Sequence, residues 1–152
     1  MAKAGAGTGS DNDNRDTEIV SVLIRISKKT RTILGLRLAE IGLATGEDDL
    51  LLALEAEHSV TVELLSEKLS VRLPTIRKSI ERLAARGLVD CITFSRLRLT
   101  AEGAAMQPRV LAVHRRIAHD VSRVIDLDRL QKITAELNDL DAGLALSLTK
   151  VT

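Results

Sequence analysis

Residues 64–99 decide the fold, and they read LLSEKLSVRLPTIRKSIERLAARGLVDCITFSRLRL. The pattern predicts a short helix, a tight turn at residues 70–72 and a second helix that begins near Leu73, followed by two short strands. Pro74 falls in the first turn of the second helix, where a missing amide proton costs little. Gly87 suits the left-handed position after that helix ends. We therefore expect a helix-turn-helix followed by a strand pair.

The second predicted helix has an apolar back and a polar front. Side chains between its apolar positions are basic or hydroxylated, which is typical of a helix that enters the major groove of DNA. The apolar positions, at helical spacing, are Leu73, Ile76, Ile80, Leu83 and Ala84. The residues expected to point away from them are Thr75, Lys78, Ser79 and Arg82.

This segment is also locally basic. Between Lys68 and Arg98 there are eight Lys or Arg and two acids, a net charge of +6, whereas the whole chain carries +1. A local basic face suits phosphate contact, although a basic surface helix without a ligand would have the same charge. The helix-turn-helix pattern favours double-stranded DNA. The residues expected to bind it are Arg72, Pro74, Thr75, Arg77, Lys78, Ser79, Arg82, Arg96 and Arg98.

The two strands after the second helix are expected to form a hairpin. If residues 93–95 are its loop, one face of the hairpin points inward, and Cys91 is a buried packing residue. Residues 60–62 are β-branched at all three positions, so we expect a short strand that pairs with the hairpin. The facing pairs on this register are Val89 with Leu99, Cys91 with Leu97, Asp90 with Arg98 and Ile92 with Arg96.

Helices are predicted on both sides of this lobe. Residues 1–15 hold nothing to bury and are expected to be a flexible tail. We expect a helix from about Asp16 to Gly42 and another over residues 47–57. Thr100 should cap a long helix that runs to about Ile125, and Asp126 should cap a last one.

Apolar residues in the first and last of these helices recur three and four positions apart, which is typical of an association seam. We therefore predict a helical dimerisation region at residues 16–44 and 101–150 and a DNA-binding lobe at 45–100. The overall fold class is mainly α with a small β-hairpin. The expected dimerisation residues are Ile19, Leu23, Ile26, Leu130, Ile133, Leu137, Leu140 and Leu144.

Composition excludes several other classes. Among 152 residues, 45% are apolar and only 1% aromatic, so Leu, Ile, Val and Ala must build the core, which favours helices. A single Cys excludes an internal disulfide, and there is no glycine-rich phosphate loop, catalytic triad or metal motif. We expect no enzyme activity, cofactor or metal site.

Asp48 and Asp49 are interpreted as helix-capping acids. Without a long apolar run or signal peptide, a soluble cytoplasmic protein with no membrane partner is expected.

Several stretches resemble one known family. RLAEIGL at residues 37–43 and LLLAL at 50–54 are similar, in sequence and spacing, to the RLAELGL and LLAL segments of the MarR family of bacterial winged-helix regulators. ERLAARGLV at 81–89 is similar to its DRLEARGLV, and LTAEG at 99–103 to its LTEEG. The order of predicted elements matches over roughly residues 17–148.

The resemblance implies a homodimeric transcription regulator without a cofactor. Its first and last two helices would interlock, and two lobes would place their reading helices in successive major grooves of a pseudo-palindromic site. Many members of the family release DNA when a small anion or phenolic effector binds between the two regions.

Three features depart from the family. The loop at residues 93–95 is shorter than usual and lacks the family's Asp-x-Arg element, so Arg96 or Arg98 would have to substitute for it. The reading helix begins with residues 72–75 where the family usually has Ser-Pro-Ser-Thr, so the Ser cap is lost. The dimerisation region has no aromatics, so we expect no stacking pocket for phenolic effectors. The short wing supports the alternative of a winged-helix protein-interaction module that has lost sequence-specific DNA reading.

Overall fold

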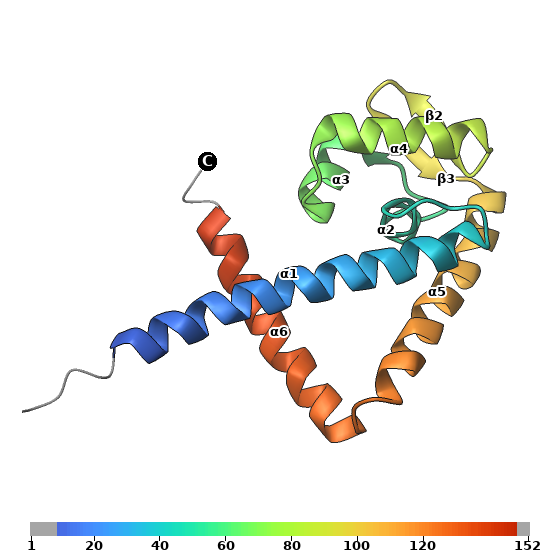
Figure 1. Ribbon diagram of the computed structural model, residues 1–152. Helices are drawn as coiled ribbons and strands as arrows, with labels where there is room; N and C mark the ends of the chain where they lie inside the picture. The colour runs from blue at the N-terminus through green and yellow to red at the C-terminus, as the bar shows by residue number, and fades with distance from the viewer. Residues whose placement is uncertain (1–8, 149–152) are drawn as a thin grey trace, which may run out of the picture. The chain divides into compact units, whose positions relative to one another are not determined.

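The structure, a computed structural model, describes residues 9–148 and the side chains of 17–147. It confirms a mainly α fold with a small antiparallel sheet (Figure 1). The chain divides into two compact units, the first ending at Val113 and the second beginning at His114. The elements in order are α1 (Gly9–Ala39), α2 (Glu47–Ala53), β1 (Val60–Thr61), α3 (Val62–Leu69), α4 (Leu73–Ala85), β2 (Val89–Thr93), β3 (Arg96–Leu99), α5 (Ala101–Ser122) and α6 (Leu127–Leu148).

The core of the first unit is aliphatic, as the composition requires. It is formed by one face each of α2, α3 and α4, by the sheet and by the start of α5. Gln107 links α5 to the end of α2, because its side-chain amide donates to the carbonyl oxygens of Leu51 (2.8 Å) and Leu54 (3.0 Å). The most deeply buried members are Leu38, Leu50, Leu51, Leu54, Leu65, Leu83, Leu97 and Val110.

The helix-turn-helix lies where the sequence predicts it. The connection between α3 and α4 spans residues 70–72. Ser70 takes the left-handed conformation (φ 51°), and the amide of Val71 donates to the carbonyl of Ser66 at 3.1 Å, which closes the C-terminus of α3. Gly87 takes the same conformation after α4, with φ 71°. Within α3, Val62 and Leu65 are buried and Leu64 is exposed.

The sheet has the strand order β1-β3-β2, with both pairs antiparallel. The predicted pairs are confirmed from Val89 opposite Leu99 to Cys91 opposite Leu97. Beyond that point the register is irregular, because Thr93, and not Ile92, faces Arg96. Ile92 is the extra residue of a bulge, and the loop is correspondingly shorter, at residues 94–95.

Two helix boundaries differ from the predictions by four residues or more. α1 begins at Gly9, so residues 9–15 of the predicted tail are helical, while 1–8 lie outside the described residues. The start of α1 is rich in Asp and Asn, which suit the first turns of a helix. α2 ends at Ala53, because the chain turns extended at Leu54 (φ −97°, ψ 149°) to bury that side chain.

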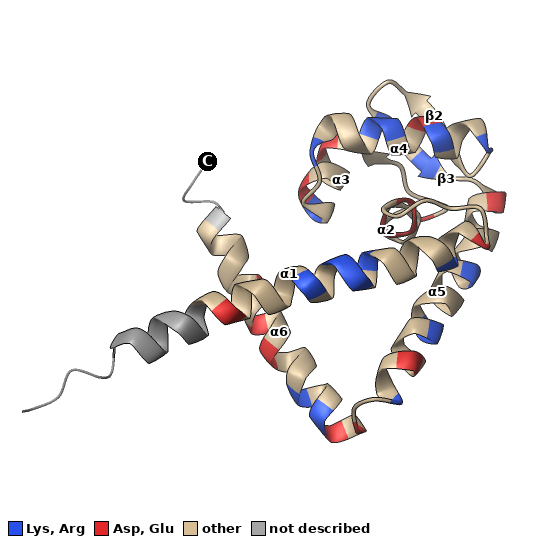
Figure 2. Ribbon diagram, viewed as in Figure 1, with Lys and Arg blue, Asp and Glu red and all other residues tan. Residues whose placement is uncertain are grey.

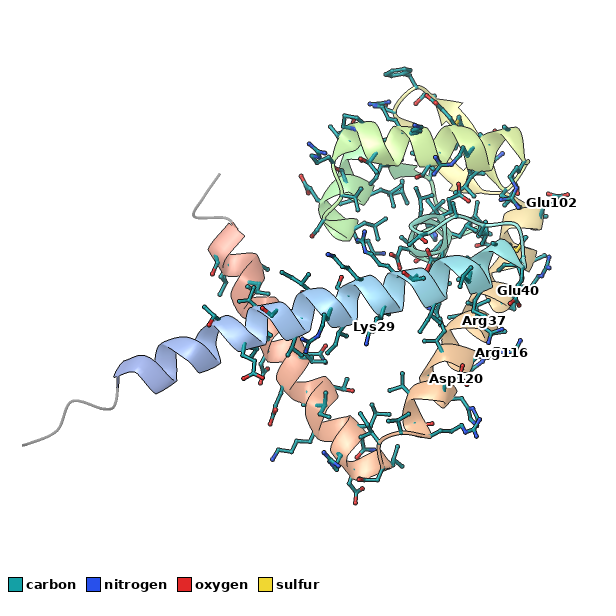
Figure 3. All side chains as sticks on the ribbon, in the orientation of Figure 1. Lys29, Arg37, Glu40, Glu102, Arg116 and Asp120 are labelled. Atoms are coloured by element: carbon teal, nitrogen blue, oxygen red, sulfur yellow. The ribbon has the colours of Figure 1, made fainter. Side chains whose placement is uncertain are left out.

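α1 has one embedded end. At its C-terminal end Leu38 is fully buried, and Arg37 pairs with Glu40 at 3.1 Å on the surface (both labelled in Figure 3). Further back, Ile19 and Ile26 of the predicted seam are exposed and Leu23 is half-buried.

The second unit contains the end of α5 and α6. The carboxylate of Asp126 accepts from the amide of Arg129 at 3.0 Å, which confirms the predicted cap of α6. Of the seam residues on α6, Leu137 (47%) and Leu144 (52%) are exposed, and the other three are half-buried. Among the described residues, no helix has the length and apolar character that a membrane span requires.

Candidate nucleic-acid interface

The orientation of α4 is fixed by its buried back. Ile76, Ile80 and Leu83 are buried in the first unit. Lys78 lies about 200° around the helix from Ile76, and its side chain is exposed, as predicted. Pro74 and Thr75 in the first turn are exposed as well. The N-terminal half of α4 therefore presents polar groups to solvent on a rigid support.

Three cations near this end of α4 have no ion pair or side-chain hydrogen bond among the described residues. They are Lys68 at the end of α3, Arg72 before α4 and Lys78 within it, and all three are exposed. Figure 2 shows the basic residues distributed along α4 and β3. Lys68 contributes to the local charge but is not among the contact residues that the sequence predicts. These three side chains are the ones available to an anionic partner without breaking an existing pair.

Arg82 is directed away from this cluster. Its Nε donates to Oε1 of Glu47 at 2.7 Å, and Glu47 is buried at the start of α2. Its Nη2 donates to the hydroxyl of Ser79 at 3.2 Å. Ser79 is only 8% exposed, so the prediction that it points outward is wrong. It lies three residues before Arg82, on the same flank of α4.

Glu47 is the centre of this contact between α2 and α4. Its second oxygen accepts from the amide of Ala44 at 2.9 Å and lies 3.8 Å from the guanidinium of Arg86. Nearby, Asp48 accepts from the amide of Gly46 at 2.9 Å. The acids thus satisfy backbone donors before α2, but Glu47 also anchors α4. Periodicity cannot reveal that second role, because the partners are 35 residues apart.

Replacing Arg82 with alanine should lower the free energy of unfolding by about 3 kcal/mol, because it leaves the buried carboxylate of Glu47 without its closest partner. Urea unfolding followed by circular dichroism measures the loss. Adding Glu47→Gln to this variant removes the buried charge that Arg82 no longer compensates and should recover part of the stability. If the double variant is less stable than Arg82→Ala alone, the ion pair is not what holds α4 in place.

Arg77 lies on another flank of α4 and contacts the wing. Its Nη2 donates to Glu63 of α3 at 3.4 Å, and its Nη1 donates to the carbonyl of Phe94 at 3.3 Å. Its Cζ also lies 4.6 Å from the centroid of the Phe94 ring. Arg77 therefore links α4 to α3 and to the hairpin.

The two wing arginines have partners too. Arg96 donates to Ser59, with a shortest distance of 2.9 Å from Nη2 to Oγ. Arg98 pairs with Asp90 at 3.0 Å, the neighbour that the predicted register gives it. Both arginines remain exposed. The sequence predicts both cations and the partner of Arg98, but not the contact of Arg96 with Ser59.

A cavity of about 250 Å³ lies between α4 and the hairpin. Cys91 lines it together with Ile80 and Leu97. Cys91 is exposed, so the prediction that it is buried is wrong. The residue is opposite Leu97 as the register requires, but this end of the hairpin lies over an open cavity instead of over a packed helix.

No protein-family model matches the sequence, and no curated protein does. Solved structures are similar at low identity. A mutant of MarR from E. coli, complexed with operator DNA, has a TM-score of 0.74 and 17% identity over 84% of this chain and 96% of that one. A MarR transcriptional regulator from Methanosarcina mazei Go1 has 0.74 and 20%, over 84% and 90%. A Mycobacterium tuberculosis MarR family protein in complex with DNA has 0.69 and 22%, over 79% and 94%.

Proposed function

We propose that this chain, which has the fold of MarR regulators, is a homodimeric transcriptional regulator that binds a pseudo-palindromic site in double-stranded DNA. Two of the similar structures are DNA complexes. The observation that carries the proposal is Lys78, exposed on the outer face of α4 without a partner among the described residues, with Lys68 and Arg72 near its N-terminal end. A DNA-reading helix needs such a group where base edges lie.

In this proposal α4 enters the major groove. Lys78 donates to guanine O6 and N7, and Thr75 contacts bases or the adjacent backbone. Lys68 and Arg72 neutralise phosphates, which favours binding by releasing counterions. The proposed roles of Arg77, Ser79 and Arg82 change. Arg77 and Arg82 hold α4 against its neighbours and set the angle at which Lys78 approaches the bases, and Ser79 is buried and bonded to Arg82.

Arg96 and Arg98 make secondary contacts in this scheme. The pair between Arg98 and Asp90 is exposed on both sides, and such pairs stabilise a protein by about 1 kcal/mol or less. A nearby phosphate can therefore compete with Asp90 for the guanidinium. Arg96 is held by neutral groups of Ser59 and has no acidic partner among the described residues.

The dimer is proposed from apolar residues that one chain leaves uncovered. On α1, Ile19 and Ile26 are exposed by about half of their surface, and Leu137 and Leu144 of α6 are similarly exposed. A second copy can cover both helices, in keeping with an interlocked dimerisation region at 16–44 and 101–150. Two lobes would then reach half-sites one helical turn apart, about 34–36 Å.

Replacing Lys78 with alanine should weaken binding to the preferred duplex by about 1–3 kcal/mol, and binding to random duplex by less. The fold should be unchanged, because Lys78 is exposed. Fluorescence anisotropy with labelled duplexes measures both affinities. The matched control is Glu81→Ala, which removes an exposed acid of the same helix and should leave binding unchanged or tighter.

Ile76→Ala provides the opposite test. It should open a cavity and lower the free energy of unfolding by about 2–5 kcal/mol. If Lys78→Ala unfolds the lobe while Ile76→Ala changes only DNA preference, the functional face of α4 is wrongly assigned. If Lys78→Ala binds every duplex as the wild type does, the protein-interaction alternative becomes the better account.

A further inference from the structure

The tip of the wing carries an aromatic ring that does not pack into the core. Phe94 is the only Phe, Tyr or Trp among 152 residues, and 88% of its surface is exposed. That fraction is the highest among the large apolar side chains described as exposed. Single exposed apolar residues are common on protein surfaces. What distinguishes Phe94 is how firmly its neighbours hold it.

The turn that presents Phe94 is braced from two helices. Arg77 of α4 donates to the Phe94 carbonyl at 3.3 Å, and its guanidinium lies over the ring. The amide of Val62, the first residue of α3, donates to the carbonyl of Ser95 at 2.9 Å. Within the turn, Thr93 Oγ1 accepts from the amide of Arg96 at 3.1 Å. The ring is therefore presented at a defined position beside the reading helix.

Charge at the wing is largely compensated within the protein. Arg77 is paired with Glu63, and Arg98 with Asp90. Of the three basic residues that contact or belong to the hairpin, only Arg96 has no acidic partner among the described residues. What the tip itself offers to a partner is chiefly the exposed ring, so its contact should be apolar.

We propose that Phe94 is the wing's contact with the minor groove that flanks the site of α4. Its ring is inserted there edge-on and packs against sugars and base edges, whereas Arg96 and Arg98 remain secondary contacts to phosphate. This inference rests on the proposed DNA-binding function. The minor groove is about 6 Å wide, which admits the edge of an aromatic ring. Apolar side chains are used as wedges in this groove by other DNA-binding proteins. An apolar contact also explains how a two-residue turn without a basic residue can serve as a wing.

The composition of the chain supplies a direct test. Because there is no Trp and no Tyr, Phe94→Trp places the only tryptophan at the wing tip. Titration with the preferred duplex should quench its fluorescence, with the same midpoint as the anisotropy of labelled DNA. The control is Val124→Trp, at a residue that is 84% exposed and lies in the second unit. Its emission should change little when the same duplex binds.

Phe94→Ala measures what the contact contributes. It should weaken duplex binding roughly tenfold, within the range seen when an aromatic that stacks on nucleic acid is removed. The slope of affinity against salt should not change, because no phosphate contact is lost. Phe94→Leu should keep part of the affinity. Thermal unfolding should be unaffected in both variants, since the ring is barely buried.

Three outcomes would overturn the inference. The ring does not touch DNA if the duplex binds without quenching the fluorescence of Phe94→Trp and if Phe94→Ala binds the duplex as tightly as the wild type. The proposed function would still hold in that case. If Phe94→Ala lowers the salt slope, the wing contact is electrostatic. If neither the wild type nor any variant binds duplex at low salt, the inference fails together with the proposed function.

Discussion

Replacing Gly103 with alanine should destabilise the first unit by about 3 kcal/mol or more, because the added methyl group has no room. A Cβ at this position would lie 2.0 Å from the carbonyl oxygen of Leu88 and 2.7 Å from Cδ1 of Leu99. The Leu88 carbonyl is backbone, and it already accepts from the amide of Thr100 at 3.2 Å. The start of α5 would have to move away from the hairpin to make space.

Gly143→Ala is the matched control for this substitution. Gly143 lies within α6, and a Cβ there would meet nothing within 4 Å. Alanine is a better helix former than glycine, so this variant should gain up to about 1 kcal/mol. Urea unfolding of both variants measures the difference. Equal stabilities would mean that α5 does not lie as close to the hairpin as described.

Leu137→Asp should dissociate the proposed homodimer. Leu137 is 47% exposed in the single chain, so an isolated protomer tolerates the substitution, whereas an interface would have to bury the new charge. Sedimentation velocity should show a mass half that of the wild type. Affinity for a two-half-site duplex should fall by on the order of a hundredfold, because the two lobes are no longer linked.

Ala135→Asp separates the interface from a general effect of charge. It introduces the same side chain on an exposed position of α6, about 200° around the helix from Leu137. This variant should remain dimeric. A wild-type dimer from Leu137→Asp, or a monomeric wild type, would contradict the proposed role of α6.

Local signals in the sequence predict the elements of the lobe well. The backbone preferences of Pro74 and Gly87 are enough to predict where α4 begins and ends. The predicted cap at Thr100 is confirmed, because its side chain accepts a 3.0 Å hydrogen bond from the amide of Gly103. The alternation of inward and outward side chains predicts the hairpin register correctly as far as Cys91, because successive residues of a strand point to opposite faces. These features depend on neighbours within a few residues.

The features that the sequence does not predict depend on distant partners. The bulge at Ile92 follows from how the hairpin pairs at its tip, not from the composition of the strand. The contacts of Arg77 and Arg82 follow from acidic partners that lie 14 and 35 residues away in the sequence. Ser79 is different, because it lies three residues after Ile76 and four before Leu83, so helical spacing alone places it on the buried side of α4.

The site therefore contains fewer available cations than the sequence indicates. Eight basic residues lie between Lys68 and Arg98, yet only Lys68, Arg72 and Lys78 have no partner among the described residues. The others mainly fix α4 and the hairpin in position. Net charge in a segment therefore overestimates the number of cations available to an anionic partner, because it does not count the groups that pair with them in the fold.

Selection from a pool of random duplexes tests whether this protein binds double-stranded DNA sequence-specifically. The affinity of the enriched duplex is compared with that of an unrelated duplex over a range of salt concentrations. We expect a pseudo-palindromic enriched sequence, bound about a thousandfold or more tighter than the unrelated one, and affinities for both that fall as salt rises. No enrichment, together with no binding to any duplex at low salt, would contradict this expectation.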